Sequence, residues 1–130
     1  MLKSHVSSES LNLVELNALY GRSAVSLGIN DQFCATATPP LYSYPKMREF
    51  EATMAGACYL TQATAETADL FAVGTEIECY SNASELVAKA KELLVSPARR
   101  KTMRQAARAR ALHDHTWQHR FKALFHKLGL

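Results

Sequence analysis

The chain has 130 residues, of which 48% are hydrophobic and 21% are charged, a composition typical of one folded domain rather than of a disordered or fibrous chain. No stretch approaches the roughly 18 apolar residues that a membrane-spanning helix needs, and the opening residues MLKSHVSSES lack the apolar centre of a signal peptide. We therefore expect a single cytoplasmic domain over residues 1–130, without a membrane span.

Charge is distributed unevenly along the chain. Residues 1–95 contain 6 Lys/Arg and 11 Asp/Glu, a net charge of −5, whereas residues 96–130 contain 9 Lys/Arg and one acid, a net charge of +8. A basic C-terminal part can bind nucleic acid or a membrane surface, or simply keep a helix solvated.

In chain order, Leu13, Leu16 and Tyr20 have helical spacing and predict a first helix, opened by serines and closed by Gly21. Residues 23–30, SAVSLGIN, follow as a short apolar strand. Residues 31–46 contain three prolines and no periodic pattern. We expect a long loop there, and loops of that length inside a compact domain are often functional.

A second helix is predicted over about residues 46–55. Pro45 suits a helix start and Gly56 suits the position just after a helix end. Phe50 and Met54 form an apolar pair four residues apart, and we expect both in the core.

The remaining elements continue the alternation of strands and helices. Strands are expected near 57–61 and 76–80, on either side of a short helix at 64–71, and an amphipathic helix follows over about 82–95. This order predicts a parallel sheet with crossover helices. Only three strands are found, near 24–29, 57–61 and 76–80, whereas a complete doubly wound sheet has five or six.

Two helices complete the chain. The first is basic and runs from Pro97 to about Leu112, and the second covers about residues 115–128. On the second, we expect four large apolar side chains to dock onto the body of the domain, because they cannot all stay in water: Trp117, Phe121, Leu124 and Phe125.

Cysteine and histidine spacing predicts no metal site. Cys34, Cys58 and Cys79 are widely separated, which argues against a disulfide framework or a zinc site, and the last two lie in strand-like runs as small hydrophobes. His115 and His119 are four residues apart, but the glutamate of an H-E-x-x-H motif is absent between them.

Three segments in order resemble a known family. They are Arg48-x-Phe50-Glu51-Ala52 with Met54-Ala55-Gly56, the Gly74-x-Glu76 turn into a strand, and HTWQHR near the end. From about residue 10 onward, the chain resembles the C-terminal, donor-binding part of a GT-B glycosyltransferase, of the "glycosyl transferases group 1" type that includes spore-maturation glycosyltransferases. The resemblance implies a partial Rossmann-like three-layer α/β sandwich, with the short parallel sheet in residues 10–95 and C-terminal helices in residues 96–130.

The resemblance also implies a ligand, a nucleotide-sugar donor, with no metal or other cofactor. Glu51 matches the family glutamate that binds the ribose hydroxyls, and Arg48 would add a cation near the diphosphate. The loop before residue 46, with Ser43 and Tyr44, would cover the diphosphate. Ser43 stands where many relatives have a second glutamate. Glu49, by contrast, is expected to be an ordinary helix-start glutamate.

Two features of the family have no counterpart here: the first strands of the donor domain and the whole acceptor domain. We therefore expect the chain to be incomplete and inactive alone, with an acceptor-binding domain or chain as a partner.

A second hypothesis is a non-enzymatic α/β interaction module, with the basic helix at 99–110 binding an anionic partner. Arg100, Arg104 and Arg108 form one stripe on that helix, while Met103, Ala107 and Leu112 form a packing face. The basic run contains no aromatic residue for base stacking, so a solvated helix face is favoured over nucleic-acid binding.

Overall fold

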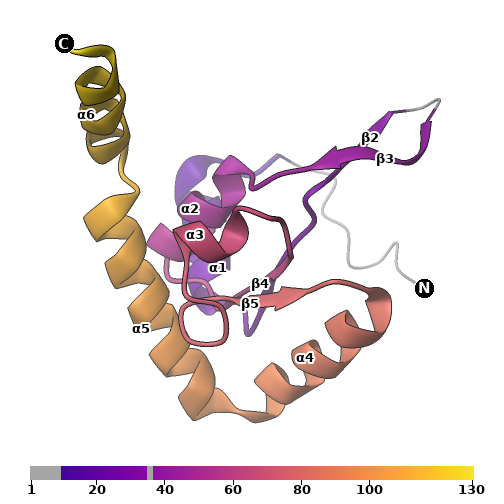
Figure 1. The fold of residues 1–130 in the computed structure, drawn as a ribbon. Coiled ribbons are helices and arrows are strands. Elements are labelled where there is room, and N and C mark those ends of the chain that lie inside the picture. Colours follow the sequence, from indigo (N-terminus) through magenta and orange to yellow (C-terminus); the bar gives the residue numbers. More distant parts are fainter. Residues whose placement is uncertain (1–9, 35–36) are drawn as a thin grey trace.

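The structure is a computed structural model that describes residues 10–34 and 37–130, with the backbone alone for residues 32–34 and 37–41. Its elements, in the order of Figure 1, are α1 (Leu13–Arg22), β1 (Ser26–Gly28), β2 (Asp31–Cys34), β3 (Ala37–Ser43), α2 (Met47–Met54), β4 (Tyr59–Gln62), α3 (Thr67–Leu70), β5 (Glu78–Tyr80), α4 (Ala83–Val95), α5 (Pro97–Asp114) and α6 (Trp117–Leu128).

The central sheet is parallel and has the order β1-β4-β5. Ser26 pairs with Tyr59, and Leu60 pairs with Glu78. The three strands lie within or beside the ranges that the sequence predicted, and the predicted parallel direction is confirmed. The predicted helix at 46–55 is α2, and Gly56 follows it with a φ of 83°, a conformation that favours glycine.

The expected loop at 31–46 is wrong for most of its length. β2 and β3 pair there as an antiparallel ribbon, with Asp31 opposite Ser43 and Gln32 opposite Tyr42. The ribbon projects from the body of the molecule (Figure 1). Its prolines, Pro39 and Pro40, hid the strand because proline argues against a central strand, whereas a two-stranded ribbon has two free edges that tolerate it.

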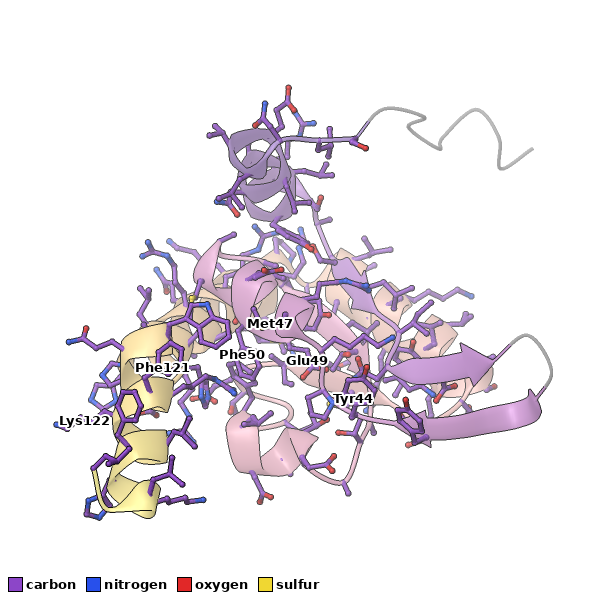
Figure 2. The ribbon with its side chains drawn as sticks, turned by 90° about the horizontal axis from the view of Figure 1, so that it is seen from above. Tyr44, Met47, Glu49, Phe50, Phe121 and Lys122 are labelled. Atoms are coloured by element: carbon purple, nitrogen blue, oxygen red, sulfur yellow. The ribbon has the colours of Figure 1, made fainter. Side chains whose placement is uncertain are left out.

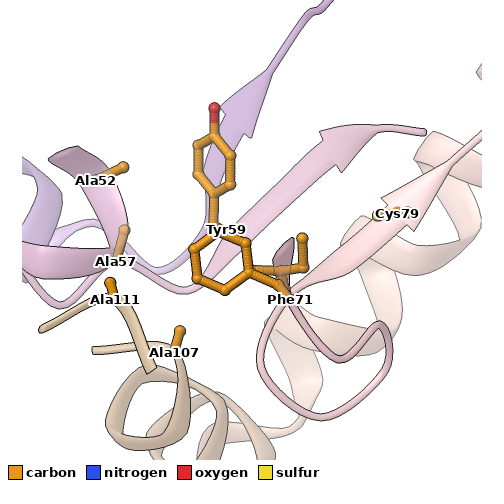
Figure 3. Close-up of a cluster of buried hydrophobic side chains, with 8 residues drawn as sticks. Ala52, Ala57, Tyr59, Phe71, Cys79, Ala107 and Ala111 are labelled. Carbon is orange, nitrogen blue, oxygen red and sulfur yellow. The ribbon is translucent and has the colours of Figure 1, made fainter. Parts of the chain in front are cut away.

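Helices cover both faces of the sheet. Successive strand residues point to opposite faces, so each strand contributes side chains to two core clusters. Tyr59 and Cys79 face one core cluster with Ala52 of α2, whereas Leu60 and Tyr80 face the other. The first cluster, drawn in Figure 3, also contains Ala57, Phe71, Ile77, Ala107 and Ala111. The second is completed by Cys58, Leu93 and Met103. The α/β three-layer arrangement that the sequence predicted is therefore present.

Four arginines of α5 donate hydrogen bonds to other helices, and one of them, Arg108, is at the same time exposed to solvent. Arg100 donates to the carbonyls of Leu93 and Leu94 at the end of α4. Three further arginines donate to carbonyls at the ends of other helices: Arg104 to Gly21 of α1, Arg108 to Met54 of α2, and Arg110 to Leu70 of α3. Cations stabilise these helix ends, because the last carbonyls lack partners within the helix.

This finding weakens the interaction-module hypothesis, since the stripe that would meet an anionic partner already has internal acceptors. On the packing face of α5, Met103 and Ala107 are buried as expected. Leu112 is 44% exposed, and Ala111 takes the inward position in its place.

The expected docking of the last helix is wrong. α6 continues beyond α5 and projects away from the sheet (Figure 1). The four side chains that were expected to dock are about half exposed, from 47% for Phe121, Leu124 and Phe125 to 58% for Trp117. Trp117 stacks on Phe121 within the helix, at a ring distance of 5.5 Å. Among the helices that the structure describes, none is long and apolar enough to cross a membrane.

Candidate functional site

The first turn of α2 is fixed at the carboxyl edge of the sheet. Glu49 Oε1 accepts a hydrogen bond from Asn30 Nδ2, which follows β1, at 2.6 Å, and another from Thr61 Oγ1 of β4 at 3.2 Å. Asn30 Nδ2 also donates to the Gln62 carbonyl at 2.9 Å. These bonds tie the start of α2 to the ends of two parallel strands, the place where open α/β sheets bind ligands.

Glu49 is fully buried, and the expectation that it is an ordinary surface glutamate is wrong. Burial raises the pKa of its carboxyl group, while the hydrogen bonds from Asn30 and Thr61 and the charge of Arg48 act in the opposite direction. Its Oε2 atom has no hydrogen-bond partner among the described residues. The error arose from the phase of α2: its buried positions are Glu49, Ala52 and Thr53, whereas Phe50 and Met54 are only partly buried against the core.

The start of α2 offers donors and positive charge. Its N-cap, Lys46, has extended backbone and makes no side-chain capping bond, so the first amides of the helix lack a capping side chain. Lys46 Nζ lies 3.3 Å from the Asp31 carbonyl. Arg48 is exposed and forms no ion pair with any residue of the described ranges. A helix start of this kind attracts anions.

Ser43 and Tyr44 lie just before this helix start. Ser43 ends β3, and its Oγ atom is buried without a hydrogen-bond partner in the part of the chain that the structure describes. Tyr44 is 41% exposed and stacks on Tyr42 at 5.6 Å. Figure 2 shows Tyr44 on the same side of α2 as Glu49.

Glu51 is exposed and lies three residues after Arg48, about one turn further along α2. It lines two hollows beside α2. One is formed with α1 and includes Asn17 and Arg108. The other lies between α2 and the start of α6 and includes Trp117 and Arg120. Ser43, Tyr44 and Arg48 line neither hollow. The structure therefore groups three predicted residues at the start of α2 and places Glu51 beside it.

The hollow against α6, which we call the α2–α6 pocket, contains residues that sequence reasoning missed. The Arg120 guanidinium lies over the ring of Phe50, 4.1 Å from its centroid, and His115 contacts the same ring at 5.1 Å. Figure 2 shows Met47 and Phe50 on the side of α2 that faces α6. The sequence pattern predicts packing for Trp117 and indicates no role for Arg120. Both lie in the HTWQHR segment, which already carried part of the family resemblance.

The described residues contain no group of three or more His, Cys, Asp or Glu side chains placed to hold a metal ion. Cys58 and Cys79 are buried and free. Burial and the nearby carboxylates of Glu49 and Glu78 raise the pKa of the Cys79 thiol to about 11, so it stays protonated at neutral pH. Cys58, just before β4, and Cys79, in β5, both pack in the core clusters, as expected for small hydrophobes in strand-like runs.

Comparison with known proteins gave one match. No curated protein matched, and neither did any solved structure. The glycosyl transferase-like family matches residues 4–126, which is nearly the whole chain and includes the sheet, the start of α2 and the α2–α6 pocket. The match confirms the resemblance seen in the sequence. The chain belongs to the glycosyl transferase-like family.

Proposed function

We propose that the chain binds the nucleotide-sugar donor of a glycosyltransferase, with the diphosphate at the start of α2 and the ribose at Glu51. The observation that carries the proposal is the start of α2 itself. It lies at the carboxyl edge of a parallel sheet, lacks a capping side chain, and is flanked by Lys46 and Arg48. In a chain of the glycosyl transferase-like family, an anion site of this kind suits the donor diphosphate.

Each proposed contact matches a chemical need of the donor. The helix amides and the Arg48 guanidinium donate to phosphate oxygens, and the Ser43 hydroxyl supplies a further donor. The Glu51 carboxylate accepts from both hydroxyls of the ribose. In sugar transfer, the bond between the anomeric carbon and the phosphate oxygen breaks, and the electron pair stays on the diphosphate. Positive charge at the start of α2 stabilises that developing negative charge.

The proposal assigns the acceptor sugar or other acceptor to a second domain or chain, so that this chain alone does not catalyse transfer. Its support is that the described residues form one α/β unit around a three-stranded sheet, whereas transfer needs sites for both donor and acceptor. Incubation with nucleotide sugars, followed by an assay for released nucleoside diphosphate, should show no turnover above the uncatalysed rate. Sustained turnover would contradict this part of the proposal.

The donor site is tested by calorimetric titration of UDP and GDP into the parent chain and two variants. Glu51→Ala should weaken binding by about 10- to 150-fold, the equivalent of about 1.5–3 kcal/mol for a hydrogen bond to a charged group. Glu66→Ala is the matched control, since Glu66 is also exposed but lies at the start of α3, away from the site. Equal affinities for all three proteins would rule out Glu51, and absence of binding to the parent would rule out the donor site.

A further inference from the structure

The α2–α6 pocket has the size of one ring system. Its volume is about 200 Å³, and Met47, Phe50, Glu51 and Met54 of α2 face Trp117 and Arg120 of α6 across it. Pockets that enclose a whole drug-sized ligand measure about 300–1,000 Å³. A nucleotide sugar is therefore too large for it, whereas a single base or sugar ring fits.

The walls of the pocket favour a flat ring. Three of its apolar side chains keep water-exposed surface. Met47 is 49% exposed and Trp117 is 58% exposed. Phe50 is the third, and it is partly buried against the core. Aromatic side chains of this kind stack nucleic-acid bases with little regard to sequence, because every base has a π-face.

Arg120 gives the pocket a directed set of donors. Its guanidinium lies over Phe50 at 4.1 Å, and no carboxylate of the described ranges pairs with it. Stacking on a ring fixes the guanidinium plane while its N–H groups remain free at the edge. Since arginine has five donors and no acceptor, whatever fills the pocket must present acceptors to it.

Bases differ at the relevant atom. Guanine carries the acceptor O6 and uracil, like thymine, the acceptor O4, whereas adenine and cytosine carry donor amino groups at the matching positions. A donor-only guanidinium at this edge can therefore pair with O6 of guanine or O4 of uracil, whereas it meets an amino donor at the same position of adenine or cytosine.

The pocket also lies where the proposed donor would place its base. Glu51, the proposed ribose ligand, forms part of the pocket wall, and Met47 links that wall to the start of α2. Residues 47 and 51 are four residues apart, slightly more than one helical turn, which is about 6 Å along the helix axis. A nucleoside diphosphate laid along α2 would thus put phosphate, ribose and base in contact with neighbouring surfaces.

We infer that the α2–α6 pocket holds the base of the donor nucleotide, that Trp117 stacks on this base, and that Arg120 makes the site prefer uracil or guanine over adenine and cytosine. This inference rests on the proposed function, because it assigns the part of the donor that Glu51 and the start of α2 do not contact. α6 is then a specificity element for the donor as well as the last helix of the fold.

Trp117 supplies the measurement, since it is the only tryptophan in the chain. UDP, GDP, ADP and CDP are titrated separately into the full chain, with Trp117 fluorescence and calorimetry as parallel readouts. Arg120→Met removes the directed donors, and Lys122→Met is the matched control. Lys122 is an exposed cation of the same helix that does not line the pocket.

We expect UDP or GDP to quench the fluorescence of Trp117. One of them should bind about 5- to 150-fold more tightly than ADP and CDP, the range for one arginine–base contact. Arg120→Met should abolish this preference, and Lys122→Met should retain it. Binding that shows no base preference, leaves Trp117 fluorescence unchanged, or keeps its preference in Arg120→Met would overturn the inference while leaving the proposed donor site standing. If no nucleoside diphosphate binds the parent by calorimetry, both proposals fail.

Discussion

Gly28 ends β1 at a point where the neighbouring strand leaves no room for a side chain. A Cβ atom at this position would lie 2.4 Å from Tyr59 Oη and 2.5 Å from Thr61 Oγ1. Both of these side chains are buried, and Thr61 also donates to Glu49, so neither can move away freely. The glycine therefore allows the carboxyl edge of the sheet to close around Glu49.

Gly28→Ala should lower the free energy of unfolding by about 1–3 kcal/mol, the usual cost of overpacking a core. The measurement is urea unfolding of the variant and the parent. Gly21→Ala is the control, because a Cβ there meets only the Ala55 carbonyl at an ordinary 3.5 Å. Equal stability of Gly28→Ala and the parent would contradict the close packing described at this edge.

Glu49 should make stability depend on pH in a direction opposite to that of a carboxylate whose pKa is lowered by folding. Burial raises its pKa in the folded state above the usual value near 4.5. Between those two pKa values the folded protein holds a proton that the unfolded chain has released. Stability should therefore fall as pH rises through this window, by up to about 1.4 kcal/mol per pH unit.

Glu49→Gln removes this proton exchange, so its free energy of unfolding should change less than that of the parent between about pH 4 and about pH 8. Urea unfolding across that range checks the prediction, with Glu66→Gln as an exposed control. Profiles that run parallel for Glu49→Gln and the parent would show that Glu49 titrates normally.

At the scale of elements, α5 holds the other helices through their C-terminal carbonyls. Arg104 is the most connected of its arginines, since it donates to carbonyls of Gly21, Ser23, Ala24 and Gly56. It thereby joins α5 to the α1–β1 connection and to the turn after α2. Part of the positive charge of the C-terminal residues is thus used in contacts within the fold, whereas Lys101, Arg120 and Lys122 remain exposed.

Arg104→Ala should therefore reduce the free energy of unfolding by about 1.5–3 kcal/mol, because it removes hydrogen bonds from a charged donor. Lys101→Ala, three residues earlier on the exposed side of the same helix, should change it by less than about 0.5 kcal/mol. Thermal or urea unfolding of both variants is the measurement. Similar effects of the two substitutions would favour the solvated-face interpretation of this helix.

The exposed position of Trp117 leads to a prediction about α6. With 58% of its surface in water, the indole should emit at the long wavelength of solvated tryptophan. Trp117→Ala should lower the free energy of unfolding by less than about 1 kcal/mol, as for most surface substitutions. A short-wavelength emission maximum or a loss of several kcal/mol would mean that α6 docks onto the body after all.

Sequence patterns predicted the elements better than their orientation. The sequence predicted the alternation of strands and helices, the end of α2 at Gly56, and the apolar strands β4 and β5, and the structure contains them. Each of these features depends on local backbone preferences. The phase of α2 could not be read in this way. Glu49 faces inward because Asn30 and Thr61, distant in sequence, supply its hydrogen bonds. The β2–β3 ribbon and the exposure of α6 likewise depend on tertiary surroundings that no local pattern reports.

The candidate site, too, was predicted from the sequence only in part. Motif matching selected Glu51 and Arg48 because they sit at fixed spacings in one segment. Arg120 and Phe50 both lie in segments that carry the family resemblance, but neither segment indicates that the two side chains meet, because they are far apart in the sequence. Residues that a fold brings together from separate segments are visible only in three dimensions.

Three parts of the molecule contact α2: the sheet, α5 and α6. The sheet fixes the start of α2 through Glu49, α5 closes its end through Arg108, and α6 forms a pocket along its side. Figure 1 shows α2 between the β2–β3 ribbon and the last helices. A ligand bound along α2 would therefore contact three separate parts of the chain.

Donor binding along α2 is tested most directly by NMR, since a chain of 14.4 kDa gives well-separated amide signals. UDP or GDP is added to ¹⁵N-labelled protein, and shift changes are mapped onto the sequence. We predict that the largest changes fall on the amides of residues 46–51, with α4 (Ala83–Val95) unaffected. Shift changes that spare residues 46–51, or that centre on the basic residues of α5, would contradict a donor site at α2.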